Sequence, residues 1–386
     1  MSDLKIGIVT KEWPPAIYGG AGVHVLQLTQ ALRTINGVNV DVHCFGGPRT
    51  DAFGYSTPDG FADSNPAVQA LATDLEIASH LQGVDVVHSH TWYANIAGHI
   101  ASLQYQIPHV ISAHSLEPLR PWKAEQLGGG FAISSWAEKT AFESAAAIIA
   151  VSDAMRADVL AAYPAINPAK VFTIRNGVDT ASFTPNHDST ISAKYGVTGR
   201  YAIFVGRITR QKGLAHLLRA WKDVPKDYGL VLAAGSPDEI GIGTEVGKLI
   251  EQLQESRPNI WWIKDMLPHS ELTAILTGAE LFICPSVYEP LGIVNLEAMA
   301  CETAVLGSRV GGIPEVVSDK ETGELVDYHG DSAEFETALT EAITRLMSQP
   351  DLLKAYGLAG RMRAMELFGW KSVAEATVEL YRRVLA

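Results

Sequence analysis

The feature that most constrains the fold is an alternation, along the whole chain, of short apolar runs and longer segments with helical periodicity. The apolar runs are rich in Val and Ile and mostly uninterrupted, which is typical of strands covered on both faces. The segments between them, such as Val23–Ile35 and Leu214–Trp221, repeat apolar residues at helical spacing. This alternation predicts parallel, doubly wound sheets. The expected strands are Lys5–Thr10, Asn39–Phe45, Asp85–His88, His109–Ala113, Ala147–Val151, Val171–Ile174, Tyr201–Val205, Leu230–Ala234, Ile260–Ile263, Leu281–Cys284 and Ala304–Leu306.

A break in this pattern divides the chain. The 386 residues are enough for two domains of ordinary size, and the expected strands are too many for one sheet. A polar stretch within Phe183–Arg200 interrupts the periodicity, and a new strand–helix series begins at Tyr201. We therefore expect an α/β fold with two Rossmann-like domains, at residues 1–185 and 186–370.

Charge and cysteine content limit which partners the protein can bind and in which compartment it is expected. The net charge is -13, and residues 1–190 alone carry ten Lys and Arg against seventeen Asp and Glu, so neither half is basic. This disfavours nucleic acid and an anionic membrane as partners. No apolar run is long enough to span a bilayer. Three scattered cysteines, Cys44, Cys284 and Cys301, are expected to be free core thiols, which favours a cytoplasmic protein.

Parallel sheets bind ligands beyond the carboxyl ends of their strands, so the residues after each strand come first. Gly206–Gly213 follows an expected strand, precedes a helix and carries Arg207 and Lys212. Two cations beside a helix N-terminus can bind an anion such as phosphate, because exposed amides and the helix dipole add to their charge. The alternative is an ordinary solvated loop.

The stretch Ser286–Ala300 places Glu289 on a loop and Glu297 one turn inside the following helix. Buried carboxylates need partners, and these two can accept hydrogen bonds from sugar hydroxyls. The backbone amides of Leu291, Gly292 and Ile293, at the start of that helix, can hold phosphate. The alternative is that each acid caps a helix or pairs with a cation.

Glycines and histidines follow other expected strands. Gly19 and Gly20 allow close approach of an anion, although a tight structural turn explains them equally well. His88 and His90 have strand spacing and could share a zinc ion with a third histidine, for which His24, His109 and His114 are the candidates. His114 ends a strand and opens the polar, aromatic loop His114–Lys123; a packed core histidine is the alternative.

Taken together, these stretches resemble the family 4 retaining glycosyltransferases of the GT-B fold, and within them the actinobacterial type of glycogen synthase and alpha-maltose-1-phosphate synthase. The pattern Arg-x4-Lys with Glu-x7-Glu carries the resemblance to the fold family, and the His114–Lys123 loop points to the glucan-synthesising subgroup. The matching segments are Lys11–Val25, Val87–Trp92, His114–Lys123, Gly128–Phe131, Ser134–Trp136, Arg175–Asp179, Gly206–Gly213 and the pair Glu289 and Glu297.

The resemblance implies a role for each matching residue. Arg207 and Lys212 would neutralise the diphosphate of a nucleotide sugar. Glu289 and the amides at 291–293 would hold the sugar and phosphate, and Glu297 would bind the ribose. His114 would lie by the transferred glucose, with its side chain near the 6-hydroxyl, and Gly19 and Gly20 would approach the phosphates.

The resemblance also implies an arrangement of the domains, which would face each other across a cleft. The C-terminal helix, residues 371–386, would cross back to the first domain, and its apolar residues Val373, Ala376, Leu380 and Val384 fit one docked face. One departure stands out. Larger glycogen and starch synthases carry Lys two residues before the glycine pair, where this chain has Ile17.

The expected activity is a retaining alpha-1,4-glucosyl transfer from ADP-glucose or UDP-glucose to a glucan non-reducing end or to glucose 1-phosphate. Glucose 1-phosphate would need a second phosphate pocket, with Arg120 and Lys123 as weak candidates beside Asn176 of the Arg175–Asp179 segment. No cofactor is expected, and a metal is not required, because two side-chain cations can take its role.

Several alternatives stay open at this point. They are a different acceptor, a metal-dependent hydrolase built on His88, His90 and a third histidine, and a non-catalytic nucleotide-sugar binding protein. A sugar-nucleotide epimerase is a weaker choice. The oligomeric state, including a homodimer, also stays open.

Overall fold

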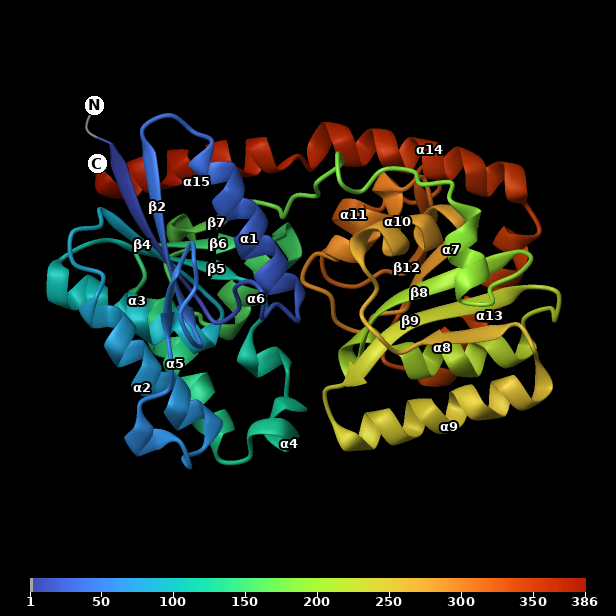
Figure 1. The fold of residues 1–386 in the computed structure, drawn as a ribbon, viewed down its shortest axis with the longest axis horizontal. Coiled ribbons are helices and arrows are strands. Elements are labelled where there is room, and N and C mark those ends of the chain that lie inside the picture. Colours follow the sequence, from blue (N-terminus) through green and yellow to red (C-terminus); the bar gives the residue numbers. More distant parts are fainter. Residues whose placement is uncertain (1–2) are drawn as a thin grey trace. The chain divides into compact units, whose positions relative to one another are not determined.

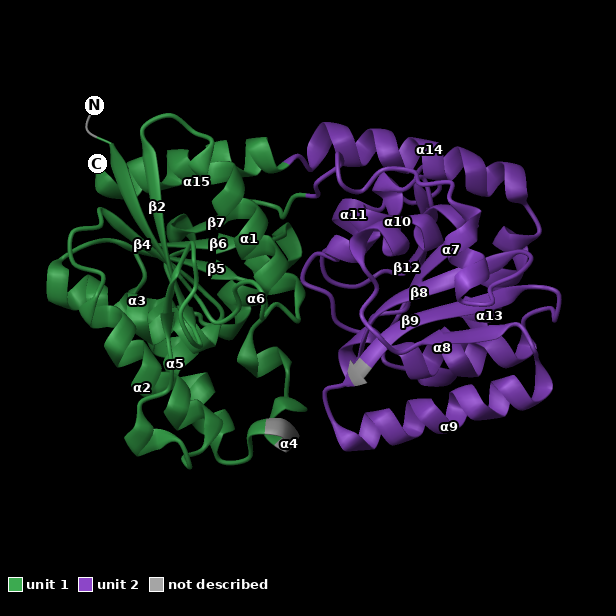
Figure 2. Cartoon of the chain, in the orientation of Figure 1, with its two compact units in different colours: residues 1–177, 370–386 green, residues 178–369 purple. Residues whose placement is uncertain are grey.

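The computed structural model describes residues 3–386, apart from the side chains of Glu125, Gln126 and Ser236. The chain forms two compact units, which Figure 2 colours separately: unit 1 is residues 1–177 with 370–386, and unit 2 is residues 178–369. The sequence pattern divides the chain after residue 185 instead. Within unit 2 the amide of Val178 donates to the carbonyl of Phe368 at 2.7 Å, which ties the two ends of the unit together.

Unit 1 is a seven-stranded parallel sheet with the strand order β3-β2-β1-β4-β5-β6-β7 (Figure 1). The order reverses at β1, which pairs in parallel with β2 on one side and with β4 on the other. The strands are β1 (Leu4–Thr10), β2 (Val38–Phe45), β3 (Phe53–Tyr55), β4 (Val86–His90), β5 (His109–Ala113), β6 (Ala147–Ala150) and β7 (Val171–Thr173). The helices are α1 (Gly20–Arg33), α2 (Pro66–Ser79), α3 (Trp92–Tyr105), α4 (Lys123–Leu127), α5 (Gly130–Ser144), α6 (Asp153–Ala162) and α15 (Trp370–Leu385), with 3-10 turns at Asp59–Phe61, Glu117–Leu119 and Pro168–Lys170.

The last helix, α15, packs on α1 and completes the core of unit 1, so the predicted return of the C-terminal helix to the first domain is confirmed. Its buried face is nevertheless wider than predicted, and it is rotated. Ala376 is exposed, and the face consists of Trp370, Val373, Ala374, Thr377, Val378, Leu380 and Tyr381. A stripe based only on small and aliphatic residues missed the aromatic rings of Trp370 and Tyr381, which contribute the largest buried surfaces.

Unit 2 is a six-stranded parallel sheet with the order β10-β9-β8-β11-β12-β13. The strands are β8 (Tyr201–Ile208), β9 (Gly229–Pro237), β10 (Ile260–Ile263), β11 (Leu281–Cys284), β12 (Ala304–Ser308) and β13 (Gly323–Val326). The helices are α7 (Ser189–Lys194), α8 (Leu214–Ala220), α9 (Ile240–Ser256), α10 (His269–Gly278), α11 (Ile293–Ala300), α12 (Ile313–Val316), α13 (Ser332–Met347) and α14 (Pro350–Leu367), with 3-10 turns η4 (Arg210–Lys212) and Trp221–Asp223.

The predicted α/β class with two parallel sheets is confirmed, and the predicted strands lie in the sheets. Two strands at sheet edges, β3 and β13, were not predicted. β3 has three residues with Gly54 at its centre, and β13 begins at Gly323, where a Cβ atom would lie 2.2 Å from the carbonyl oxygen of Val305. Glycine permits this close approach of two strands, but it also removes the apolar pattern by which strands are recognised.

Within the part of the chain that the structure describes, no helix combines the length and the apolar character that crossing a bilayer requires.

Candidate functional site

The strand order of unit 2 brings two predicted stretches together. β8 and β11 are neighbours, and the strand order reverses between them, which is the place where open parallel sheets bind their ligands. Lys212 lies in the turn after β8, and Glu289 lies in the loop after β11. The two residues are far apart in the sequence and adjacent in the fold.

Lys212, which is partly buried, forms an ion pair with the buried Glu289, with Nζ of Lys212 2.6 Å from Oε2 of Glu289. The hydroxyl of Ser286 donates to the same carboxylate oxygen at 3.0 Å. Burial opposes the charge on Lys212, but the carboxylate of Glu289 more than compensates, and the pKa of Lys212 is raised. Lys212 is therefore a fixed cation, held in place by the acid beside it.

Gly213 explains how the turn after β8 comes so close to the loop after β11. It has φ +64°, and a Cβ atom there would lie 1.9 Å from the carbonyl oxygen of Pro285. The carbonyl of Gln211 accepts the amide of Val287 at 2.9 Å, which joins the same two loops. Only glycine fits a left-handed conformation this close to another backbone.

Arg207 lies at the end of β8, but its guanidinium pairs with Asp238 and not with either predicted glutamate. Nη1 of Arg207 donates to both carboxylate oxygens of Asp238, at 2.6 and 2.8 Å. The side chain of Arg207 is 37% exposed, so it remains accessible to a ligand. Asp238 directly follows β9, and the rule that picks out residues after strands could have found it.

Glu297 lies one turn inside α11, and its carboxyl makes no hydrogen bond or ion pair with the described residues. Burial raises its pKa to about 7, and the positive charge of Lys212 partly opposes this shift. Gly292, with φ +96°, caps the helix ahead of Ile293. The carbonyl of Glu289 accepts the amide of Gly312 at 2.9 Å, which holds this loop over the helix start.

The turn after β1 in unit 1 is occupied by an acid that sequence reasoning missed. Oε2 of Glu12 accepts the backbone amides of Tyr18 and Gly19, both at 2.9 Å. A Cβ atom at Gly22 would lie 2.5 Å from the same oxygen, so the glycines make room for this carboxylate. The Gly19 amide is thus engaged by Glu12, while Gly20 begins α1. Glu12 follows β1 almost directly, and this position after a strand could have identified it from the sequence.

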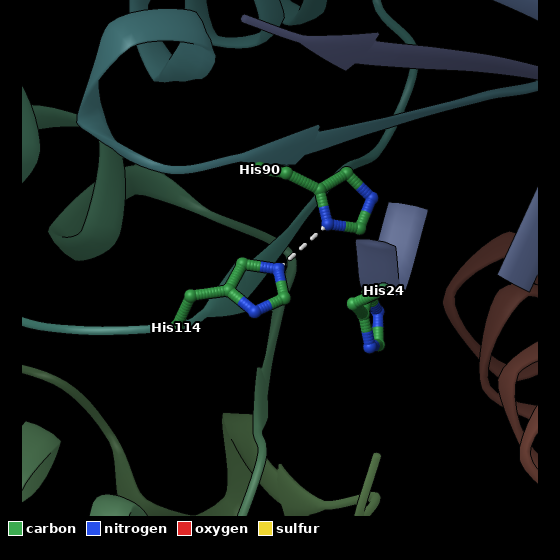
Figure 3. A group of neighbouring side chains, drawn as sticks. All are labelled: His24, His90 and His114. Carbon is green, nitrogen blue, oxygen red and sulfur yellow. Dashed lines mark hydrogen bonds between the residues drawn. The ribbon is translucent and has the colours of Figure 1, made fainter. Parts of the chain in front are cut away.

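Three histidines gather at the carboxyl ends of β4 and β5. His90 ends β4, His114 follows β5, and His24 comes from α1. Nδ1 of His90 and Nε2 of His114 lie 3.0 Å apart and share a hydrogen bond, which Figure 3 shows as a dashed line. The ring of His24 meets that of His114 edge-on, with the centroids 4.7 Å apart. The predicted approach of His88 and His90 on one side of β4 also occurs, with centroids 4.2 Å apart.

The predicted zinc site combined His88 and His90 with a third histidine. Nitrogen atoms of His24, His90 and His114 lie within 4.8 Å of one another. Ligands of one tetrahedral zinc ion lie closer, roughly 3.4 Å apart for the usual Zn–N distances. The closest pair already shares a proton, and both nitrogens of His88 are engaged, by Tyr381 at 2.6 Å and Ser112 at 2.9 Å. The arrangement as it stands is a hydrogen-bonded pair, His90 and His114, packed against His24, whose ring nitrogens have no hydrogen-bond partner among the described residues, and it does not have zinc geometry.

The loop after His114 is fixed by a buried acidic network. Oε1 of Glu138, on α5, accepts the backbone amide of Glu117 at 2.8 Å and the hydroxyl of Tyr163 at 2.5 Å. Burial raises the pKa of Glu138 to about 8. Ser134 donates to the side chain of Glu117 at 2.6 Å. Sequence reasoning missed this network, because it spans three elements.

The predicted acceptor-side residues do not all come together. Arg120 donates to the hydroxyl of Ser115 at 3.0 Å and lies 3.9 Å from Glu117. Lys123, which is buried, begins α4 one turn later, and its amide donates to the carbonyl of Arg120 at 2.9 Å. Asn176 lies instead beside His24. Burial lowers the pKa of His24 well below its usual value, and Asn176 opposes this shift only in part.

The comparisons with known proteins agree with this geometry. Residues 18–182 match the model of Glycosyltransferase Family 4, and residues 189–363 match that of Glycosyl transferases group 1. Alpha-maltose-1-phosphate synthase of Mycolicibacterium smegmatis is 50% identical, over 99% of this chain and 100% of the relative. The synthase of the same name from Mycobacterium tuberculosis is 48% identical with the same coverage. Sucrose-phosphate synthase from Thermosynechococcus elongatus shares the GT-B fold, with a TM-score of 0.83 at 24% identity over 99% of each chain.

Proposed function

The chain belongs to the glycosyltransferase family of the alpha-maltose-1-phosphate synthases, and from this premise we propose that it transfers glucose from ADP-glucose to the 4-hydroxyl of glucose 1-phosphate. The product would be alpha-maltose 1-phosphate. Similarity along the entire chain to a relative whose name states that product supports the choice of acceptor. UDP-glucose is the second donor to test.

The observation that carries the proposal is the Lys212–Glu289 ion pair at the carboxyl ends of β8 and β11. A departing diphosphate develops negative charge, and Lys212 is a cation whose position and protonation are fixed in advance. Preorganised charge of this kind usually contributes more to enzymatic rate acceleration than any other single effect. Arg207, partly exposed beside Asp238, supplies a second cation that can fork a phosphate.

The remaining residues at this end of the sheet can bind the sugar and the ribose. Glu289 can accept hydrogen bonds from the hydroxyls of glucose, and the amides of Leu291, Gly292 and Ile293 can donate to sugar and phosphate oxygens. We assign the ribose to Glu297, whose carboxyl has no protein partner among the described residues. In unit 1, we assign His114 to the transferred glucose. The amide of Gly19 already donates to Glu12, which leaves Gly20 of this turn to approach the phosphates.

The chemical step proceeds with retention, by attack on the same face of the sugar. The bond between the anomeric carbon and the diphosphate oxygen breaks, and a bond to the acceptor's 4-oxygen forms. The acceptor's proton passes to the departing phosphate oxygen, so no protein base is needed. Lys212 and Arg207 neutralise the leaving group, which makes a metal ion unnecessary for this step.

Arg120 and Lys123 are the proposed contacts for the phosphate of glucose 1-phosphate. Ser115 and Glu117 orient the guanidinium of Arg120, and Lys123 lies within one turn of it. The three buried free cysteines support the proposal that the protein works in the reducing cytoplasm.

The test is a nucleoside diphosphate release assay that crosses ADP-glucose and UDP-glucose with glucose 1-phosphate and glycogen, followed by sizing of the product. We expect release only with an acceptor present, fastest with ADP-glucose and glucose 1-phosphate, and a disaccharide phosphate as product. Chain extension of glycogen alone would replace the proposed acceptor with a glucan end.

Two further outcomes would contradict the transferase itself. Ligand-induced stabilisation without diphosphate release would indicate a binding protein, and activity abolished by a chelator would indicate a metal-dependent hydrolase. An Arg120→Ala, Lys123→Ala double variant should raise KM for glucose 1-phosphate about tenfold or more, with KM for the donor unchanged.

A further inference from the structure

The hydrogen bond between His90 and His114 joins two imidazole rings, and this limits their protonation. Nδ1 of His90 and Nε2 of His114 are 3.0 Å apart. Such a bond needs one N–H and one lone pair, so the tautomer of one ring dictates that of the other. Figure 3 shows the other ring nitrogen of His114 facing away from His90.

Both rings are neutral at ordinary pH. Burial lowers the pKa of His90 well below its usual value, with neighbouring His88, His114 and His24 acting in the same direction. Burial lowers the pKa of His114 to about 4. Each of the two rings therefore carries a single N–H, and only two arrangements of the pair are available.

The surroundings of His90 distinguish the two arrangements. Its Nε2 is buried and has no hydrogen-bond partner among the described residues. If His90 carried its proton there, a buried donor would be left unsatisfied, which is a rare and costly defect. If the proton lies on Nδ1, His90 donates to Nε2 of His114, and His114 must carry its own proton on Nδ1.

We propose that His90 is a positioning residue that fixes His114 as the Nδ1–H tautomer, so that His114 presents a neutral hydrogen-bond donor to an oxygen of the transferred sugar. This inference rests on the proposed function, since it takes His114 as the group beside the glucose. His114 is only partly buried, and its Nδ1 makes no hydrogen bond with the described residues, so this nitrogen is available to a ligand.

The reaction gains from a neutral donor at this place. Bond breaking makes the sugar ring positive, and a protonated imidazole beside it would repel that charge. The described histidines around His114, namely His24, His88 and His90, are held neutral mainly by burial, and so add no charge. A fixed donor orients the sugar without this penalty, and its orientation is established before the substrate binds.

The direct test is nitrogen-15 NMR of the full chain labelled at histidine, with the His114 signals assigned from a His114→Asn variant. We expect Nδ1 of His114 to be protonated in the wild type and its Nε2 to be unprotonated. In a His90→Leu variant, which offers no hydrogen bond, we expect a mixture of tautomers. A protonated Nε2 of His114 in the wild type would overturn the inference.

Kinetics provide the second test. His90→Leu should lower kcat about tenfold to a hundredfold, the range known for groups that orient metal-bound histidines, with little change in KM for ADP-glucose. His90→Asn keeps an N–H close to the position of Nδ1 and should restore kcat to within a few-fold of wild type. Equal losses in the two variants would contradict the assigned donor.

A matched control separates this role from loss of stability. His43 is also buried in unit 1, and its Nδ1 shares a 2.8 Å hydrogen bond with Tyr55, away from the cluster. His43→Leu should lower the unfolding temperature as His90→Leu does, but leave kcat unchanged. The NMR test does not require turnover of a donor. Failure of the proposed function can therefore be distinguished from failure of the tautomer inference. Retention of one equivalent of zinc that His24→Ala abolishes would also overturn the inference.

Discussion

At the scale of single residues, the candidate site depends on charges that burial and pairing hold in place. Lys212 keeps its proton because Glu289 lies 2.6 Å away, whereas Glu297 has no such partner and its pKa is raised to about 7. The two carboxylates of the motif therefore differ in their surroundings, since Glu289 is paired with a cation and Glu297 is not. This difference fits their proposed roles: Glu289 lies beside Lys212, the cation that would neutralise the leaving group, and Glu297 would bind the ribose.

Replacement of Lys212 by Ala should lower kcat by about 10²–10³, the typical effect of losing one preorganised donor to a developing anion. The measurement is the diphosphate release assay at saturating donor and acceptor. Lys222→Ala, which removes an exposed lysine from the same unit, serves as the control and should retain full activity. A Lys212→Ala enzyme with normal kcat would exclude Lys212 from the chemical step.

Binding of ADP-glucose should strengthen as pH rises from 6 to 8. Glu297 ionises in this range, and a carboxylate accepts a stronger hydrogen bond from a ribose hydroxyl than a protonated acid does, worth about fivefold in Kd. The diphosphate of a nucleotide sugar is a diester and does not titrate there. The measurement is the Kd for ADP-glucose by calorimetry, whose pH dependence should be lost in Glu297→Gln. The control Glu255→Gln, at an exposed site, should keep it. A wild-type Kd that is flat with pH would refute the assignment.

At the scale of elements, the turn after β8 and the loop after β11 are locked together by one glycine. Gly213→Ala would place a methyl group 1.9 Å from the carbonyl oxygen of Pro285 and push the two loops apart. We expect a kcat at least about tenfold lower, together with a lower unfolding temperature. Gly330→Ala is the matched control, because Gly330 also has a positive φ, +90°, but open space around it. It should cost about 1–2 kcal/mol of stability and no activity.

The loop that carries His114 is held to α5 by Glu138, and this contact should make stability depend on pH. The folded pKa of about 8 exceeds the value in the unfolded chain, so the folded state binds more protons and stability falls as pH rises from about 4.5 to 8. Glu138→Gln can still accept both hydrogen bonds without a buried charge. Its unfolding temperature should decline less than that of wild type between pH 5 and 9. Glu143→Gln, which changes a partly exposed acid of α5 paired with Lys139, should show the same pH dependence of stability as wild type.

At the scale of the whole molecule, the net charge is -13, so the proposed reaction of small anionic substrates depends on local cations. Dialysis against a chelator should leave kcat unchanged, and added magnesium should have no effect, because Lys212 and Arg207 neutralise the leaving group. The measurement is diphosphate release before and after dialysis, with metal content determined in parallel. Loss of activity that magnesium or zinc restores would contradict the proposed mechanism.

Much of the fold could be predicted from the sequence, because strand and helix periodicity is local and repeats along the whole chain. The class, the two sheets and most strands follow from it, as does the importance of residues at strand ends. The pattern does not reveal β3 or β13, where glycine replaces apolar residues at a close strand contact. Nor does it reveal the exposure of Ala376, since the rotation of α15 depends on which large side chains find room against α1.

The sequence by itself determined which residues stand at the carboxyl ends of buried parallel strands, and so which side chains could meet a ligand. Only the tertiary structure decided how they pair: Lys212 with Glu289, Arg207 with Asp238, and His90 with His114. The physical reason is that each pairing joins different strands of a sheet, or the loops that follow them. Strand order, together with the room that glycines such as Gly213 leave between backbones, decides which of these side chains meet.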